Sequence, residues 1–202
     1  MPSATRPGSN ICSDAIEAMT SLMDRTGQVP SLAELAKSMS VGEDALRRIF
    51  RDEGHLLMVV AENAMILLHD ECTRAVVAAD AGDPIAQFSA LADAYVEWSH
   101  NNPREFRFIG SMPAGQFEGN ETLTRYEQSI HEVMLRMLAR AQSAGAIAED
   151  EDLQLLVAIA HTYAYGVASK MLLGDLARWT PGLSDRDAAR AILHGLIERV
   201  LR

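Results

Sequence analysis

The segment SLAELAKSMSVGEDALRRIF, residues 31–50, decides the fold of this chain because its spacing is that of a helix-turn-helix. Such a motif needs a small residue where two helices nearly touch, a tight turn about four residues later, and apolar residues that hold the second helix against the first. Ala36 supplies the small residue, Ser40 falls at the turn, and Leu46 and Ile49 hold the second helix. Every apolar position of the pattern is filled. The alternative is a helical hairpin that only packs on a third helix.

The residues around this motif predict its boundaries. Ser31 and Glu34 have the spacing of a capping box, which predicts the start of a short helix. A second short helix is expected from about Gly42 to Phe50, and a long amphipathic helix from Leu56 to Ala79. The hairpin therefore lies near the N-terminus, with one helix before it and a long helix after it.

Helical periodicity continues through the rest of the chain, and no convincing strand pattern appears. The segment SMPAGQFEGN, residues 111–120, is expected to be a loop or a broken helix because it contains a proline and two glycines. Residues 150–177 are apolar nearly all round, which predicts a buried central helix. We predict an all-α protein of about nine helices, with a helix-turn-helix domain over residues 1–55 and a larger helical bundle over residues 56–202.

The composition is that of an ordinary folded protein with an acid excess. Apolar residues make up 48% of the 202 residues, and the net charge of -10 argues against a protein that coats nucleic acid or membrane surfaces. Two cysteines indicate reduced thiols rather than a disulfide framework, and the first ten residues lack the apolar core of a secretory signal. The apolar stretch from Leu153 to Ser169 is shorter than the about 20 residues of a membrane span. We expect a cytoplasmic protein without a membrane segment or a cofactor.

Basic residues gather in the second helix of the motif, although the first domain contains six Lys and Arg against eight Asp and Glu. Arg47, Arg48 and Arg51 are candidates for contacts to phosphates or guanine edges. Glu43 and Asp44 lie at the start of the helix, where a carboxylate either favours the helix dipole or accepts a hydrogen bond from cytosine N4. Binding is expected to be modest and steeply salt-dependent. With phosphate partners on the first helix included, the predicted DNA-contact residues are Ser31, Lys37, Glu43, Asp44, Arg47, Arg48 and Arg51.

The stretch SLAELAKSMSVGEDALRRIFRDEGHLL, in this position, resembles the TetR (tetracycline-repressor-like) family of bacterial regulators. The resemblance covers most of the chain. YVEWSHNNPREFRFIGSM looks like the family's helix-Pro-aromatic junction, and AHTYAYGVASKMLLGDL is similar to the central helix of a ligand-binding subgroup, with Tyr165-Gly166 where His-Gly is usual. The resemblance implies an all-helical homodimer whose N-terminal domains bind successive major grooves of a double-stranded DNA operator. It also implies a small-molecule effector in the C-terminal domain.

Several positions depart from the pattern of that family. Ser40 stands at the turn where Gly is usual, at a typical cost of about 1 kcal/mol for a left-handed residue. Gly42 stands where Ser usually caps the next helix, and Gly caps almost as well. Arg47 replaces a Tyr that commonly touches phosphate, and it can do the same with full charge. Glu53 replaces a usual Lys and would repel the DNA backbone.

Aromatic and sulfur-containing side chains gather in the larger domain. Most are expected to form its core, but a bundle cavity lined by such residues and a few polar groups is also how a ligand site is built. His131 is either a hydrogen-bonded core histidine or a ligand contact. The expected ligand is apolar or aromatic. The predicted ligand-binding residues are Trp98, Phe106, Met112, Phe117, Tyr126, His131, Met134 and Tyr163.

The last two helices are expected to form a dimer contact, because two helices from each subunit make a four-helix interface. Their stripes of small and aliphatic residues allow close packing, either between subunits or within one chain. The predicted interface residues are Ala164, Ala168, Ala188, Ile192, Gly195, Leu196 and Val200.

No pattern of an enzyme or a metal site accompanies these features. His69 and Cys72 lie one helical turn apart, but no second pair completes a metal site, and no nucleophile–base pair or glycine-rich phosphate loop is visible. The expected function is a one-component transcriptional regulator, a repressor released from its operator when ligand entry shifts the long helix. The alternative, favoured by the acidic N-terminal third, is a TetR-like helical dimer that binds a ligand or protein partner without specific DNA binding.

Overall fold

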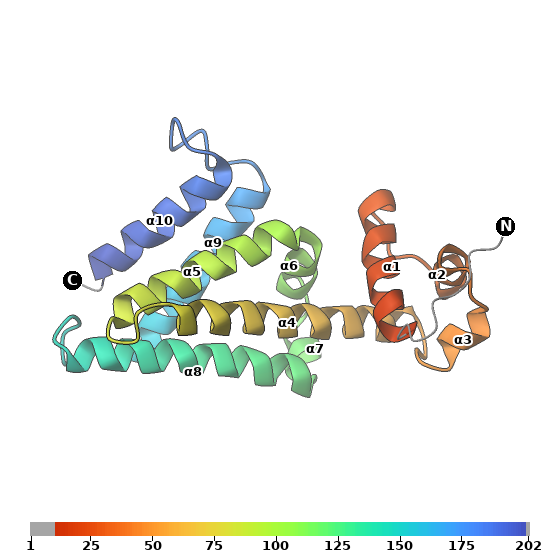
Figure 1. Cartoon of the computed structure of the whole chain (residues 1–202), viewed down its shortest axis with the longest axis horizontal. Coiled ribbons are helices and arrows are strands. Elements are labelled where there is room, and N and C mark those ends of the chain that lie inside the picture. Colours follow the sequence, from red (N-terminus) through yellow and green to blue (C-terminus); the bar gives the residue numbers. More distant parts are fainter. Residues whose placement is uncertain (1–10, 201–202) are drawn as a thin grey trace. The chain divides into compact units, whose positions relative to one another are not determined.

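The computed structural model describes residues 11–200, which form ten helices and no strand (Figure 1). The all-α prediction is confirmed. The helix count exceeds nine because part of the segment predicted as a loop or broken helix forms a short helix, in which the carbonyl of Pro113 accepts the first turn's hydrogen bonds. The helices are α1 (Ile11–Thr26), α2 (Leu32–Met39), α3 (Glu43–Arg47), α4 (Glu53–Ala78), α5 (Pro84–Asn101), α6 (Pro103–Gly110), α7 (Ala114–Glu118), α8 (Glu121–Ser143), α9 (Leu153–Leu172) and α10 (Asp185–Val200).

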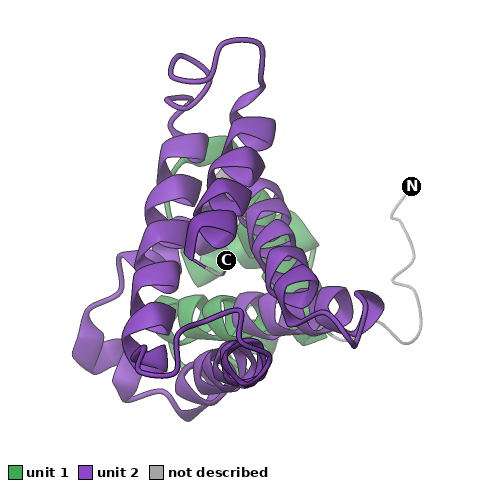
Figure 2. Ribbon diagram, turned by 90° about the vertical axis from the view of Figure 1, so that its left-hand side faces the viewer, with its two compact units in different colours: residues 1–63 green, residues 64–202 purple. Residues whose placement is uncertain are grey.

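The chain divides into two compact units, residues 1–63 and residues 64–202 (Figure 2). The division falls inside α4, so this one continuous helix contributes residues to both units. The sequence-based boundary at residue 55 lies two residues after the start of the same helix. Each unit has its own buried core, as expected for independently packed domains.

The first unit is built around the helix-turn-helix of α2 and α3. Ala36 is 4% exposed and Leu46 is fully buried, while Ile49 is partly buried against the same core. All three therefore lie as the sequence pattern predicts. The fully or nearly buried side chains of this core are Ala15, Met19, Leu32, Leu35, Ala36, Leu46, Phe50, Leu56 and Val60.

The turn between α2 and α3 has the backbone that the motif requires. Ser40 adopts the left-handed conformation with φ 56°, and it is the one residue other than glycine with a positive φ among residues 11–200. Its position matches the tight turn predicted from sequence. The helix after the turn is shorter than predicted, Glu43–Arg47 rather than 42–50, because the chain turns after Arg48 and buries Phe50 in the core.

Three side chains satisfy the free N–H groups at the start of α2. Ser31 and Glu34 form the predicted capping box, with the Ser31 hydroxyl accepting a hydrogen bond from the Glu34 backbone N–H at 3.2 Å. Glu53, the first residue of α4, accepts a hydrogen bond from the Leu32 N–H at 3.0 Å. Glu53 therefore has a structural role, connecting the start of α4 to the start of α2, that its charge alone did not predict.

In the second unit α5 is the central helix and packs against α6, α8, α9 and α10. An ion pair and a hydrogen bond add to the contact between α5 and α10: Arg190 pairs with Glu97 at 2.9 Å, and His194 Nε2 lies 3.0 Å from the Asp93 carboxylate. Because these side chains are more than one-third exposed, the pairs orient the helices and stabilise them only weakly.

The helix α9 departs from the prediction of a helix buried on all sides. By length and composition it is the one helix among residues 11–200 that could cross a membrane, and only 28% of its apolar window is buried in the chain. Leu155, Ile159 and Tyr163 lie on its exposed side at 54%, 44% and 40% exposure. A single such helix is weak evidence for a membrane protein, since apolar helices of soluble proteins pass the same test. The exposed side of α9 therefore forms an apolar stripe.

Candidate functional site

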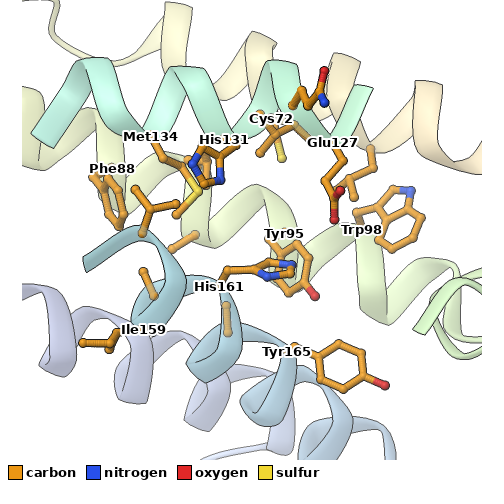
Figure 3. Close-up of a pocket in the computed structure, with 18 of the residues that line it drawn as sticks. Cys72, Phe88, Tyr95, Trp98, Glu127, His131, Met134, Ile159, His161 and Tyr165 are labelled. Carbon is orange, nitrogen blue, oxygen red and sulfur yellow. The ribbon is translucent and has the colours of Figure 1, made fainter. Parts of the chain in front are cut away.

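A cavity of about 850 Å³ lies inside the second unit, between helices α4 to α10. Its volume falls in the range of pockets that hold small organic molecules. The walls are mostly aliphatic and aromatic, with Met65 and Leu68 of α4, Phe88 of α5, Met134 of α8 and Val157 of α9 among them. Figure 3 shows side chains from several helices converging on this space. The bundle therefore encloses a largely apolar site without any residue of the first unit.

Six of the residues predicted to bind ligand line this cavity, and two do not. The six are Trp98, Phe106, Met112, Phe117, His131 and Met134. Tyr126 instead packs edge-on against His69 at 5.0 Å between ring centres, and the Arg125 guanidinium lies 5.0 Å from its ring. Tyr163 lies on the exposed side of α9. Helical spacing alone could not separate these positions, since both tyrosines occur on amphipathic helices that also contribute to the wall.

Two tyrosines that the sequence prediction omitted form one end of the cavity with Phe106. The ring of Tyr165 stacks on Phe106 at 5.2 Å with an interplanar angle of 23°, and Tyr95 meets Phe106 edge-on at 6.3 Å. The unusual Tyr165-Gly166 pair in the segment that resembles a family helix was a signal for the first of them. Burial raises the pKa of Tyr95 well above its ordinary value, so its hydroxyl stays neutral.

The Tyr165 ring also lies directly over the last residue of α6. An ideal Cβ placed on Gly110 would lie 2.6 Å from the Tyr165 hydroxyl oxygen and 2.7 Å from its Cε2. Such distances are far below van der Waals contact, so only glycine fits here without moving the ring. Gly110 therefore sets how closely α6 and the Tyr165 side chain approach at the cavity wall.

Few of the side chains that line the cavity are polar. His131 and Gln154 form a hydrogen bond between Nε2 and Oε1 at 3.1 Å, which pairs the histidine whose role the sequence left open. Glu127 points from α8 towards the side of the cavity where Trp98 and Tyr95 lie (Figure 3). The indole Nε1 of Trp98 is buried without a hydrogen-bond partner among the described residues.

His69 and Cys72, which lie one helical turn apart, do not form a metal site with each other: each has a different environment. His69 Nε2 hydrogen-bonds the Ser129 hydroxyl at 3.0 Å. Cys72 lies in the cavity wall, where burial raises the pKa of its thiol to about 12 and keeps it protonated. Within residues 11–200 no group of three His, Cys, Asp or Glu side chains is placed to hold a metal ion.

The helix-turn-helix surface combines free and paired arginines. Arg48 and Arg51 are exposed and form no ion pair with any residue of the described part of the chain. Arg47 is held by Glu43, with its Nε donating to the carboxylate at 2.7 Å. The pair is exposed, so it is readily exchanged for another anion. Of the other predicted DNA contacts, Lys37 and Asp44 are exposed, while the hydroxyl of Ser31 is engaged in the α2 cap.

The residues predicted to form a dimer contact fall into three groups. Ala168 and Ala188 are fully buried within one chain, as in the intramolecular alternative. Ala164, Leu196 and Val200 line the cavity. The remaining two, Ile192 and Gly195, are partly exposed on α10.

Comparison with known proteins places this geometry among regulators. Residues 88–196 match the model of the family described as tetracyclin repressor-like, C-terminal domain. No curated protein matches the sequence.

Solved structures of similar fold cover nearly the whole chain. One is a protein of unknown function from Rhodococcus sp. RHA1, with a TM-score of 0.80 at 22% identity, covering 98% of this chain and 100% of that one. A second is a transcriptional regulator of the TetR/AcrR family from Thermobifida fusca YX-ER1, with a TM-score of 0.71 at 16% identity and coverages of 96% and 100%. A third is the ketosteroid transcriptional regulator KstR2 of Mycobacterium tuberculosis, with a TM-score of 0.69 at 13% identity and coverages of 98% and 98%. At these identities the similarity is one of fold.

Proposed function

The chain belongs to the tetracycline-repressor-like (TetR) family and has the fold of its transcriptional regulators, and from this premise we propose a ligand-responsive, DNA-binding regulator. In this proposal the protein is a repressor that leaves its operator when a small apolar or aromatic molecule enters the cavity. The observation that carries the proposal is the continuity of α4. Leu56 and Val60 of this helix are buried in the helix-turn-helix core, while Met65, Leu68 and Cys72 line the cavity.

A ligand in the cavity would act on DNA binding through that helix. Filling the space against Met65 and Leu68 changes the packing of α4, and a rigid helix transmits a displacement along its length. Because Leu56 is part of the core that holds α2 and α3, the displacement reaches the DNA-contact surface. Coupling of this kind is reciprocal, so operator DNA should also weaken ligand binding.

The DNA-contact surface in this proposal is α3 and the turn that follows it. Arg48 and Arg51 are available for phosphates or guanine edges, and Arg47 becomes available when phosphate replaces Glu43 as its partner. Exchange of one anion for another conserves most of the electrostatic interaction, so the Arg47–Glu43 pair reduces affinity without preventing binding.

The proposed assembly is a homodimer in which a second copy covers the exposed side of α9. Leu155, Ile159 and Tyr163 follow one another at intervals of one turn on this side, and Ile159 also borders the cavity. An exposed apolar stripe on a helix is typical of an interface. In a dimer the two helix-turn-helix units would contact two half-sites about one DNA turn apart, roughly 34 Å.

A second candidate function is a TetR-type dimer that binds its ligand without specific DNA binding. It is favoured by Glu53, which occupies a position where the family commonly has a lysine and is committed here to the Leu32 N–H. It is also favoured by the pairing of Arg47 with Glu43, because this pair occupies one of the three arginines that could contact DNA.

Binding to DNA that flanks the protein's own gene, measured by fluorescence anisotropy over a range of salt concentrations, tests the first proposal. In Arg47→Ala we expect weaker binding and a slope of log K against log salt that is smaller by about 2, because each subunit of a dimer loses about one phosphate contact. The matched control is Arg74→Ala, an exposed arginine on the part of α4 that lies in the second unit. Absence of specific binding by the wild-type protein at low salt would favour the second candidate function.

A further inference from the structure

The charged residues of the cavity wall all have the same sign. They are Glu118 of α7 and Glu127 and Glu132 of α8, and neither lysine nor arginine from the described residues lines the cavity. The histidines of the wall, His131 and His161, are the remaining side chains there that can gain a positive charge. An apolar site whose fixed charges are carboxylates discriminates among ligands by their charge.

Two of the three glutamates have no partner among residues 11–200. Glu132 faces Arg136 at 3.6 Å on the exposed side of α8. The carboxylates of Glu118 and Glu127 form no ion pair or hydrogen bond among the described residues. The carboxylate of Glu127 points from α8 towards the side of the cavity where Trp98 and Tyr95 lie (Figure 3). Glu127 is exposed to solvent, and a ligand that covers its carboxylate must provide a partner equivalent to the water that it displaces.

The aromatic side chains of the cavity wall favour the same charge. Tyr95, Phe106 and Tyr165 form a contiguous group, with the last two stacked at 5.2 Å. The faces of aromatic rings attract cations, and the attraction grows where water is excluded. A ligand carboxylate or phosphate in the same place would lie among carboxylates and ring faces without a cationic partner, and burial of an unpaired charge is strongly unfavourable.

Building on the proposed function, we propose that the cavity selects an amphipathic organic cation. This ligand has an aromatic or alicyclic body that fills the apolar wall, and a protonated or quaternary amine, or a comparable onium centre, that lies between Glu127 and the Tyr95–Phe106–Tyr165 group. Neutral apolar molecules bind more weakly because they cover Glu127 without pairing with it. Organic anions of the same shape bind at least about tenfold more weakly than the cation.

The test uses two ions of the same shape and opposite charge, tetraphenylphosphonium and tetraphenylborate, in isothermal titration calorimetry with sodium buffers at pH 8. Histidine side chains are generally neutral at this pH, so the glutamates dominate the charge of the wall. We expect the phosphonium ion to bind at least about tenfold more tightly than the borate, a difference of about 1.4 kcal/mol. Equal or tighter binding of the borate would overturn the inference, as would failure of the phosphonium ion to bind.

Glu127→Gln removes the charge and keeps the shape of the side chain. Its affinity for the phosphonium ion should fall by about fivefold, as expected for a partly solvated ion pair, while its affinity for the borate should not fall. The matched control is Glu132→Gln, whose carboxylate is exposed and already paired with Arg136, and it should change the ratio of the two affinities less. Retained borate binding also shows that the variant is folded. An unchanged ratio in the double variant Glu118→Gln with Glu127→Gln would contradict the proposal.

The effect of each ion on DNA binding separates this inference from the proposed function. Preferred binding of the borate together with release of DNA would overturn the charge preference and leave the proposed function standing. Preferred binding of the phosphonium ion without any change in DNA binding would support the charge preference and contradict effector control of DNA binding.

Discussion

Replacement of Gly110 by alanine tests the packing of α6 against the cavity wall with a change of one methyl group. The added Cβ would lie 2.6 Å from the Tyr165 hydroxyl oxygen, 2.7 Å from Cε2 and 3.0 Å from Cζ. Since all three atoms belong to the Tyr165 side chain, its ring must shift from its stacked position on Phe106. Overpacking of this kind typically costs about 1–3 kcal/mol.

The intrinsic helix preference of the two residues acts in the opposite direction. Alanine is favoured over glycine inside a helix by up to about 1 kcal/mol, and Gly110 is the last residue of α6 with no positive φ. The net expectation for Gly110→Ala is a loss of about 1–2 kcal/mol in the free energy of unfolding. For a chain of this length the melting temperature would fall by roughly 2–8 °C.

The effect of Gly110→Ala on the free energy of unfolding should change sign when the tyrosine ring is absent. In a Tyr165→Ala background the methyl group meets no ring, so Gly110→Ala should be neutral or stabilising by up to about 1 kcal/mol. The coupling energy between the two sites is then about 1–3 kcal/mol. Tyr165→Phe should restore little stability to Gly110→Ala, because it removes the hydroxyl and leaves Cε2 in place.

Urea unfolding followed by far-ultraviolet circular dichroism, at one fixed protein concentration, measures all four members of this cycle. The matched control is Gly115→Ala on α7, where an added Cβ meets no atom within 4 Å and a small stabilisation is expected. Additive effects of Gly110→Ala and Tyr165→Ala would refute the reasoning, since they would mean that the ring moves aside at no cost.

Two further predictions concern the exposed side of α9 and the buried thiol. Leu155→Glu places a charge on the apolar stripe without touching the cavity wall, and light scattering should show a shift from dimer to monomer; a monomeric wild-type protein would contradict the proposed interface. Cys72 is protonated in the folded protein up to a pKa of about 12, whereas the unfolded thiol loses its proton from about pH 9, so stability should fall as the pH rises above 9. The part of this fall that is due to Cys72 should be missing in Cys72→Ala, and an identical pH dependence of unfolding in both proteins would show that the thiol does not contribute.

The helix-turn-helix could be predicted almost completely because its determinants are local. The capping box of Ser31 and Glu34 and the turn at Ser40 each involve residues a few positions apart, and the structure reproduces both. The pairing of Arg47 with Glu43 also follows from helical spacing, since residues four apart lie on the same side of a helix. By contrast, Glu53 and Leu32 are 21 positions apart, and their hydrogen bond exists only because the folded unit brings two helix starts together.

The side chains that line the cavity could be predicted from the sequence only in part. Amphipathic periodicity identified helices rich in aromatic residues, and six of the eight ligand-binding candidates line the wall. Tyr126 and Tyr163 are also aromatic residues on amphipathic helices, yet their side chains lie outside the cavity wall. The reason is that neighbouring helices set the rotation of each helix about its axis. The same packing decides that α9 buries only one side within the chain and leaves Leu155 uncovered.

Sequence alone therefore determined the elements whose causes lie within a few residues: the all-helical class, the helix-turn-helix, its caps and the basic residues after its turn. Tertiary structure decided which side chains face the cavity, that its charged residues are glutamates without a lysine or arginine among the described lining, and that Gly110 and Tyr165 meet. The physical reason is the range of the interactions. Backbone hydrogen bonds and helix caps act between near neighbours in the chain, whereas a cavity is defined by helices that are distant in sequence and are oriented only when the whole bundle packs.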